Sequence, residues 1–411
     1  MTRTERTYYI ISCLYRLSWS ALGPTYALFL LARGLDLFRL NLVLAVYLLT
    51  TCLFEVPTGA LADVFGRKRS FVVSCVVRAA AFGLYFLSDS FGQFLVAEFI
   101  DAIGTTLATG AFDAWALDGI RDEGGDRAAD HLFARANMLA QVTAIIGGLS
   151  AAQFAQRDLS WPWLMGTSGF LVCALAGAVL MRERRPGGAS VAPRVHAFVS
   201  VGVTIRDGLA SMRSQPVVRG LCLLTVLVAF ATMPALHMWQ PRFQALAGPG
   251  PWLFGWIWVL LNLAVMAGSA LIPTLVGRWG RARALALAFA WRAVALATAA
   301  LATTFVPALI GFLLQEMAFG FNEPVQQAWM NEYATSTQRA TLLSLRAMAF
   351  TLGGATGLAS LGWLAQQTSI TEAWVLCACA YAVAVPGYLL LGRVARRQAP
   401  SAVAPALRAS A

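Results

Sequence analysis

Charged residues are scarce in this chain of 411 residues: Asp, Glu, Lys and Arg together make up only 12%, whereas a soluble globular domain carries about 25%. Apolar residues account for 58% of the sequence and gather into long runs. A helix needs a run of about 20 apolar residues to cross a bilayer. The shortage of charge therefore excludes an ordinary soluble protein and predicts an all-α membrane protein.

The residue patterns of common active sites are missing as well. The sequence has no glycine-rich loop that would cradle a phosphate, no Ser, His and Asp set for hydrolysis, and only three histidines. Its seven cysteines fall inside apolar runs without the spacing of metal ligands, and such cysteines behave as small buried hydrophobic residues. We therefore expect that the protein is not an enzyme and that it holds no cofactor and no metal.

The net charge of +11 does not predict a nucleic-acid partner, because the basic residues stand mainly in short segments between the apolar runs. Cytoplasmic segments of membrane proteins are enriched in Lys and Arg. This rule places both termini in the cytoplasm and leaves Arg33, Arg39, Arg157 and Arg242 in outer loops. The runs predict twelve transmembrane helices, at about 8–31, 40–62, 70–87, 93–118, 132–155, 161–181, 217–240, 252–276, 283–302, 306–332, 342–366 and 373–391.

The twelve spans fall into two similar halves. We expect a six-helix half over 1–181, a cytoplasmic loop over 182–216 with a surface helix, a second six-helix half over 217–392, and a disordered cytoplasmic tail over 393–411. The halves repeat with one constant offset and without a gap, which relates Gly66, Arg67, Arg69, Arg78, Trp115 and Asp118 to Gly280, Arg281, Arg283, Arg292, Trp329 and Glu332.

The segment 59–69, between the second and third spans, reads G-A-L-A-D-V-F-G-R-K-R. It resembles the signature loop of the major facilitator superfamily of transporters, because every fixed position of the pattern G-x-L-A-D-x-x-G-R-K-x is filled. The segments 54–63, 109–118 and 339–345 resemble a bacterial branch of small drug-exporter-like facilitators. This resemblance implies two pseudo-symmetric six-helix halves that hold a substrate between them and work by alternating access.

The resemblance also implies a conformational latch in this loop, made of Gly59, Asp63, Gly66, Arg67 and Asp118. Arg67 would pair with Asp118, and Asp63 would face the second half. From its position alone, Asp63 is also placed to accept hydrogen bonds from backbone donors at a helix start. The chain departs from the proton-driven drug antiporters in two places, which leaves the direction of transport open. Glu98 stands where they carry Arg, and Thr143 and Ala144 replace a Gly-Pro pair.

Ionisable residues inside spans are costly and are usually paired or functional. Counting about 1.5 Å of depth per residue, we expect six of them to neutralise one another, either as structural pairs or as a gating network in the cavity: Arg16, Glu55, Arg78, Asp113, Arg292 and Glu323. Three further acids lack a cation at their own depth, namely Asp101, Glu316 and Glu98.

An unpaired buried carboxylate tends to take up a proton. These three acids are therefore candidates for proton coupling; alternatively they hydrogen-bond to neighbouring helices, with Glu98 in water at the rim. The aromatic residues expected either to line a cavity or to lie in the core or against lipid are Trp19, Tyr26, Trp115 and Trp329.

The leading hypothesis is a secondary active transporter: proton-coupled efflux of a small amphipathic drug or secondary metabolite. It would work as a monomer in the bacterial cytoplasmic membrane, with the substrate, protons and the lipid bilayer as partners. Two alternatives stay open. One is proton-coupled uptake of an organic solute, and the other is a non-transporting sensor or assembly partner with the same fold.

Overall fold

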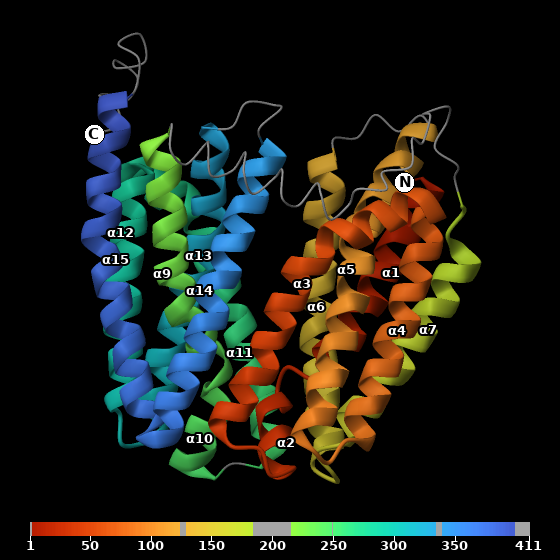
Figure 1. Cartoon of the computed structure of the whole chain (residues 1–411), viewed down its shortest axis with the longest axis horizontal. Helices are drawn as coiled ribbons and strands as arrows, with labels where there is room; N and C mark the ends of the chain where they lie inside the picture. The colour runs from red at the N-terminus through yellow and green to blue at the C-terminus, as the bar shows by residue number, and fades with distance from the viewer. Residues whose placement is uncertain (1, 124–128, 184–214, 249, 334–338, 399–411) are drawn as a thin grey trace. The chain divides into compact units, whose positions relative to one another are not determined.

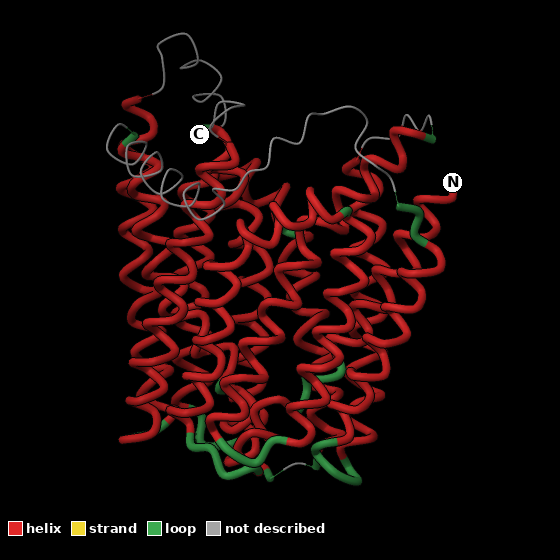
Figure 2. The backbone as a smooth tube through the Cα atoms, turned by 45° about the vertical axis from the view of Figure 1, so that its right-hand side comes forward, coloured by secondary structure: helices red, strands yellow, loops and turns green. Residues whose placement is uncertain are grey.

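The computed structural model describes residues 2–123, 129–183, 215–248, 250–333 and 339–398. Within these ranges the chain is helical and contains no strand (Figure 2). Eleven of its helices are long and apolar enough to cross a membrane. The all-α membrane fold expected from the composition is therefore confirmed. The surface helix expected in 182–216 falls almost wholly outside the described residues.

The chain divides into two compact units, and neither is a single stretch of sequence. Unit 1 comprises Met1–Leu35, Val46–Ser200 and Pro249–Val259. Unit 2 comprises Asp36–Ala45, Val201–Gly248 and Leu260–Ala411. The helices that cross these boundaries, α3 and α11, therefore belong to both units.

The helices of the first half run from α1 to α7 (Figure 1). Their bounds are α1 Arg3–Ser20, α2 Tyr26–Ala32, α3 Leu37–Phe65, α4 Arg67–Leu87, α5 Phe91–Asp122, α6 Ala129–Ala155 and α7 Trp161–Leu180. The first expected span, 8–31, is not one helix, because a turn separates α1 from α2. Pro24 lies in that turn and has no N–H to continue a helix ladder. The α1–α2 pair accounts for the twelfth span beside the eleven long helices.

The helices of the second half run from α9 to α15. Their bounds are α9 Pro216–His237, α10 Trp239–Ala247, α11 Pro251–Ala270, α12 Ile272–Leu301, α13 Phe305–Glu332, α14 Arg339–Gln367 and α15 Ile370–Gln398. The last helix continues beyond the expected end of its span at 391, so the tail expected from 393 is still helical up to Gln398. The rest of that tail lies outside the described residues.

The repeat seen in the sequence is also a repeat of helix boundaries. α3 begins at Leu37 and α11 at Pro251; α5 begins at Phe91 and α13 at Phe305. Both pairs are separated by the same offset that relates Gly66 to Gly280. α12 is broken at Gly280, where φ is 71° and ψ is 163°, at the position that matches Gly66 between α3 and α4 (φ 98°, ψ 139°). Only glycine adopts this backbone conformation readily, so both units use a glycine to make the same sharp turn.

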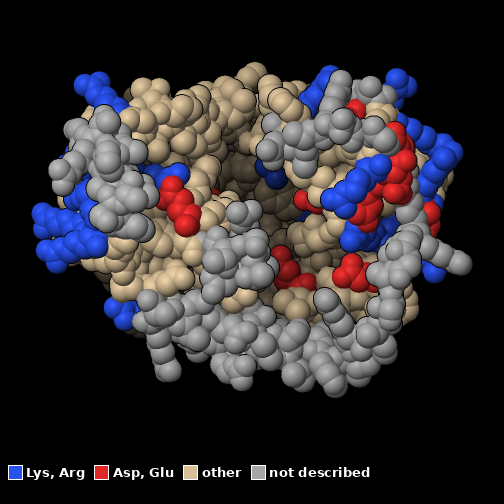
Figure 3. Space-filling view, turned by 90° about the horizontal axis from the view of Figure 1, so that it is seen from above, with Lys and Arg blue, Asp and Glu red and all other residues tan. Residues whose placement is uncertain are grey.

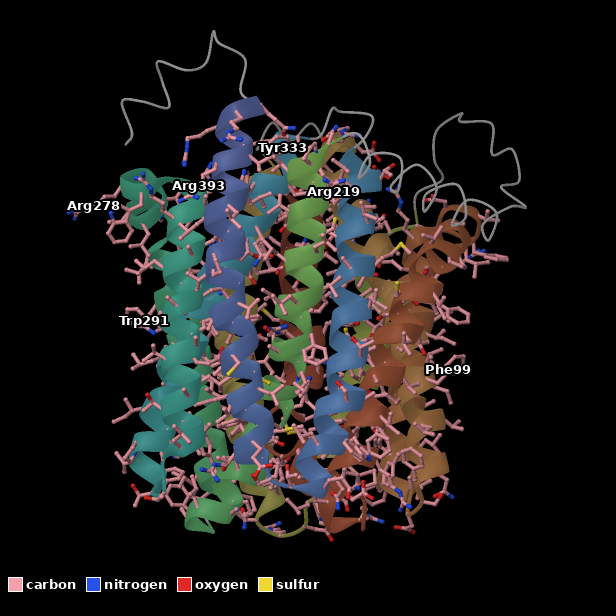
Figure 4. The ribbon with its side chains drawn as sticks, turned by 60° about the vertical axis from the view of Figure 1, so that its left-hand side comes forward. Phe99, Arg219, Arg278, Trp291, Tyr333 and Arg393 are labelled. Carbon is pink, nitrogen blue, oxygen red and sulfur yellow. The ribbon has the colours of Figure 1, made fainter. Side chains whose placement is uncertain are left out.

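The outer surfaces of both units suit lipid. Phe99 on α5 and Trp291 on α12 point outward and are 40% and 42% exposed (Figure 4). Basic residues instead gather at the ends of the helices: Figure 4 shows Arg219, Arg278 and Arg393 at one end of unit 2. The space-filling view from above shows Lys and Arg gathered on this face (Figure 3). This distribution is what a membrane-spanning bundle requires.

Candidate functional site

The signature loop ends in an ion pair that recurs in both units. Arg67, the first residue of α4, binds the carboxylate of Asp118 on α5 and donates from Nη1 to the carbonyl oxygen of Ala114 at 2.9 Å. At the matching positions of unit 2, Arg281 binds Glu332. The pairing of Arg67 with Asp118 that the resemblance implied is therefore present, and it is duplicated. Each partner is about one-third to one-half exposed.

Asp63 does not sit at a helix start. It lies in the last turn of α3, and its carboxylate faces Nη2 of Arg67 at 3.8 Å. The residue before α4 is Gly66, which offers no side-chain cap. Asp63 thus supports Arg67 electrostatically, and the expectation that it accepts hydrogen bonds from α4 is wrong. Gly59 lies within α3, where a side chain would meet open space.

A fully buried arginine forms the polar centre of unit 1. Arg78 on α4 donates from Nε and Nη2 to the two carboxylate oxygens of Asp101 on α5, at 2.8 and 3.1 Å. Its third group, Nη1, donates to the hydroxyl of Tyr15 at 2.7 Å, and the ring of Phe170 lies 4.5 Å from the guanidinium carbon. This is a bidentate ion pair, which is stronger and more specific in geometry than an arginine–carboxylate contact through a single hydrogen bond.

Asp101 was expected to lack a cation, and this expectation is wrong. The error came from measuring depth from the cytoplasmic ends of helices that differ in length: α4 has 21 residues and α5 has 32. Counted from the turn that joins them, Arg78 precedes the end of α4 at Leu87 by nearly the same interval as Asp101 follows the start of α5 at Phe91. Measured from this turn, Arg78 and Asp101 therefore lie at nearly the same depth along their helices.

The matching arginine in unit 2 has a different partner. Arg292 on α12 donates from Nε and Nη2 to Oε1 of Gln315 on α13, at 2.8 and 2.7 Å, and from Nη2 to the hydroxyl of Tyr381 at 2.7 Å. Gln315 is the residue that the repeat places opposite Asp101. Its own amide donates from Nε2 to Oε1 of Glu316 at 2.5 Å. A neutral amide therefore stands between the buried cation and the buried acid.

Arg292 was expected at the depth of Glu323, but the two do not pair. Glu323 on α13 is bound by Nη2 of Arg346 on α14, at 2.5 Å. Of the other expected charges, Arg16 donates to Gln141 at 3.0 Å and Asp113 accepts from the hydroxyl of Tyr8 at 2.7 Å.

Glu55 is exposed and pairs with no residue that the structure describes. The six charges expected to neutralise one another therefore do not form one network.

Glu98 is buried in unit 1, so the alternative that placed it in water at the rim is wrong. Only 6% of it is exposed. The hydroxyls of Tyr26, at 3.2 Å, and Tyr85 both donate to its Oε2. Both tyrosine rings pack against the indole of Trp163. Tyr26 is therefore part of a polar cluster inside the unit.

The tryptophans considered as cavity residues lie in different environments. Trp19 is 36% exposed and lies beside the guanidinium of Arg16, at 4.8 Å. Trp115 and Trp329, which match by the repeat, are 3% and 4% exposed and belong to the interiors of their units. Trp115 packs in an apolar core and donates from its indole N–H to the carbonyl oxygen of Arg182 at 2.9 Å. For these two tryptophans the core interpretation holds.

Unit 2 contains a small polar recess that the sequence did not reveal. Its lining includes Phe319, Phe350, Thr225, Thr232, Arg292, Asn322, Glu323 and Gln326. Three buried polar atoms of this lining have no hydrogen-bond partner: Nη1 of Arg292 and both amide atoms of Asn322. Polar groups that converge on a recess without internal partners are typical of binding sites. Asn322 and Gln315 are uncharged, so a search for charged residues in spans passes over them.

Comparison with known proteins agrees with this architecture. The profile of the Major Facilitator Superfamily matches residues 8–290 and 251–410. The uncharacterized MFS-type transporter YxaM of Bacillus subtilis (strain 168) is 26% identical over 158 residues, which are 38% of this chain and 39% of that protein. The match thus spans about two fifths of the length of that relative.

Solved structures share the fold at low sequence identity. The nucleoside transporter NupG superposes with a TM-score of 0.78 at 11% identity, covering 95% of this chain and 99% of its own. An auto-inhibited peptide transporter of the POT family gives 0.75 at 15% identity, covering 97% and 98%. Because the family profile covers far more than half of the sequence, the chain belongs to the Major Facilitator Superfamily of transporters.

Proposed function

We propose that this protein is a proton-coupled secondary transporter of a small organic compound, in which Glu316 carries the proton. The observation behind this proposal is the position of Glu316. It is 4% exposed, it receives an amide hydrogen bond from Gln315, and it forms no ion pair with any residue that the structure describes. The charged form of such a carboxylate is costly, whereas its protonated form is not. A carboxylate of this kind binds a proton in one state and releases it when water reaches it in another.

Of the other two coupling candidates, Glu98 is the second choice and Asp101 is no longer favoured. Both carboxylate oxygens of Asp101 are bound by Arg78 in a buried ion pair, so Asp101 is not an acid without a cation partner. Glu98 has no arginine partner, but the hydroxyls of Tyr26 and Tyr85 both donate to its carboxylate, whereas Glu316 accepts from the amide of Gln315.

In the proposed cycle, alternating access exposes the site to each side of the membrane in turn. The ion pairs Arg67–Asp118 and Arg281–Glu332 would be latches that close in one state and open in the other, with Asp63 tuning the first. The transporter would be a monomer in the bacterial cytoplasmic membrane with both termini in the cytoplasm.

Two directions of transport follow from different observations. Export of an amphipathic compound is favoured by the resemblance to drug-exporter-like facilitators, which is carried by the segments 54–63, 109–118 and 339–345. Uptake with the proton is favoured by the chain from Arg292 through Gln315 to Glu316. Protonation of Glu316 would leave the charge of Arg292 without an acid, and a substrate could then supply it.

The test uses cells that lack their own exporters and proteoliposomes with an imposed proton gradient. In cells, export would lower the accumulation of ethidium or carboxyfluorescein, whereas uptake would raise it. In proteoliposomes, wild-type protein and the control Glu372→Gln, an exposed residue of α15, should show transport that responds to the proton gradient. Glu316→Gln should remove that response while the protein stays folded in the membrane. An undiminished response in Glu316→Gln would rule out Glu316 as the proton carrier.

A further inference from the structure

The recess in unit 2 is built around an arginine whose charge is not cancelled by direct contact with an acid. Arg292 is 0% exposed, and its Nε and Nη2 are occupied by Gln315 and Tyr381. Arg292 lines the recess, and its buried Nη1 has no hydrogen-bond partner. The matching Arg78 in unit 1 uses its Nη1 on Tyr15 and is neutralised by Asp101. Arg292 therefore keeps a free donor and an unpaired positive charge that its counterpart Arg78 does not.

Asn322 supplies a second unused polar group on the same recess. It is 2% exposed, and neither its amide nitrogen nor its carbonyl oxygen has a partner. Leaving a buried amide without hydrogen bonds destabilises the fold, and most buried polar groups in native proteins have a partner. A ligand that accepts from Arg292 and Asn322 would satisfy these groups together.

The other charged groups of the recess decide which ligand fits. Glu323 is taken by Arg346, and Glu316 is separated from Arg292 by the amide of Gln315. With Glu316 protonated, one positive charge is left over in this part of unit 2. A carboxylate matches this charge and accepts hydrogen bonds from both a guanidinium and an amide. The rings of Phe319 and Phe350, which also line the recess, offer an apolar surface for the rest of the molecule.

We propose that this recess binds the carboxylate of an aromatic or apolar organic anion, through Nη1 of Arg292 and the amide of Asn322. The inference rests on the proposed function, since it names the substrate class of the same transporter. It adds that the anion and the proton on Glu316 are bound together, so that they move in the same direction.

The test measures binding directly, on the full chain in lipid nanodiscs, with benzoate as the probe. Benzamide, a neutral molecule of the same shape, and benzylamine, a cation, serve as controls. Benzoate should bind wild-type protein about tenfold more tightly than either control, because only its carboxylate can accept charge-assisted hydrogen bonds from Arg292. Equal or tighter binding of benzamide or benzylamine, or no binding of benzoate, would overturn the proposal.

Three variants locate the site. Asn322→Leu removes both unused amide atoms, and Gln315→Glu gives Arg292 the acidic partner that Arg78 already has; each should weaken benzoate binding about tenfold. Glu316→Gln, which imitates the protonated acid, should bind benzoate at least as tightly as wild type. The control Asn41→Leu, a buried asparagine of α3 outside the recess, should bind as wild type does. Wild-type binding by Asn322→Leu or Gln315→Glu would overturn the proposal.

Transport separates this inference from the function on which it rests. Proton-driven flux of another substrate, without benzoate binding, would overturn the inference and leave proton-coupled transport standing. Benzoate binding at the recess without any proton-coupled flux would overturn the proposed function and leave the binding site standing.

Discussion

Asp101 and Gln315 occupy the same place in the two units, each 23 residues after the arginine whose guanidinium it holds. The geometry of the two contacts is alike, with Nε and Nη2 of each arginine engaged. The charge is not alike, because one partner is a carboxylate and the other an amide. The repeated helix pair thus carries a neutralised arginine, Arg78, in unit 1 and an arginine without an acidic partner, Arg292, in unit 2. The proposals above depend on that difference.

The first prediction concerns the buried ion pair between Arg78 and Asp101. Asp101→Asn would leave the buried charge of Arg78 without a counter-ion, and breaking such a pair costs about 3–5 kcal/mol. The expected result is a marked fall in the thermal stability of the purified protein. The double variant Arg78→Gln with Asp101→Asn should recover part of the loss, because no unpaired charge is then buried. Equal stability of wild type and Asp101→Asn would mean that the pair contributes nothing to the fold.

The second prediction separates the two remaining coupling candidates. Glu98→Gln keeps a group that accepts from Tyr26 and Tyr85, so the packing of these rings against Trp163 should survive. If Glu316 carries the proton, transport by Glu98→Gln in proteoliposomes should still respond to the proton gradient. Loss of that response in Glu98→Gln, together with a normal response in Glu316→Gln, would mean that Glu98 in unit 1 carries the proton and Glu316 does not.

The third prediction concerns the duplicated ion pair at the signature loop. Asp118→Asn and Arg281→Gln remove partly exposed pairs, and such pairs contribute only about 0–1 kcal/mol to stability. Thermal unfolding should therefore change little, whereas the transport rate should fall several-fold if the pairs hold one state of the cycle. Exchanging the charges, with Arg67→Asp and Asp118→Arg together, should restore part of the rate.

The matched control for this series is Asp89→Asn. It breaks a partly exposed ion pair with Arg33 that lies away from the loop. A rate that falls as far in Asp89→Asn as in Asp118→Asn would show that the effect is not specific to the latch.

The fourth prediction tests the turn glycines. Gly66→Ala and Gly280→Ala place a side chain on backbone that is strained for any residue except glycine, which costs roughly 1–3 kcal/mol. The two should cost similar amounts, because the methyl group added at Gly66 meets only the end of the flexible Glu183 side chain, which can move, and the space at Gly280 is open. Gly59→Ala, in helical α3 with open space around it, should be neutral or slightly stabilising. Chemical unfolding in detergent ranks the three variants.

Much of the fold could be predicted from the sequence, because a helix that crosses a bilayer needs a long apolar run and such runs are visible in the sequence. Apolar length marked the spans, and the constant offset between the halves tied Arg67 and Asp118 to Arg281 and Glu332 before any contact was visible. The break between α1 and α2 was missed, since apolar length continues through it and only Pro24 signals a turn. Membership of the superfamily is confirmed; the drug-exporter-like branch stays a prediction.

The site was harder to predict, because pairing depends on which way a side chain turns and not on depth alone. Helix lengths measured from one end misplaced Asp101, and no pattern in the sequence shows that Trp115 packs in a core. The repeat itself could have found Gln315, since the offset between the halves carries Asp101 directly onto it. Polar but uncharged residues in spans, such as Asn322, should be searched as closely as charged ones in chains of this kind.

The last prediction uses stability to ask what Asn322 is for. A buried asparagine without partners burdens the fold, so Asn322→Leu, with a side chain of similar size, should stabilise the empty protein by roughly 1 kcal/mol. Asn41 is equally buried and its Oδ1 also has no partner, but its amide nitrogen donates to the carbonyl oxygen of Leu37 at 2.7 Å. Because Asn41→Leu also removes this hydrogen bond, it should bring a smaller gain than Asn322→Leu. Unfolding curves without ligand measure both variants.

A gain in stability at Asn322 combined with a loss of benzoate binding would mean that stability has been given up for ligand recognition at this position. A purely structural asparagine gives the opposite pattern, in which Asn322→Leu lowers stability and leaves ligand binding unchanged. Because the two outcomes differ in the sign of the stability change, the result does not depend on how tightly the probe binds.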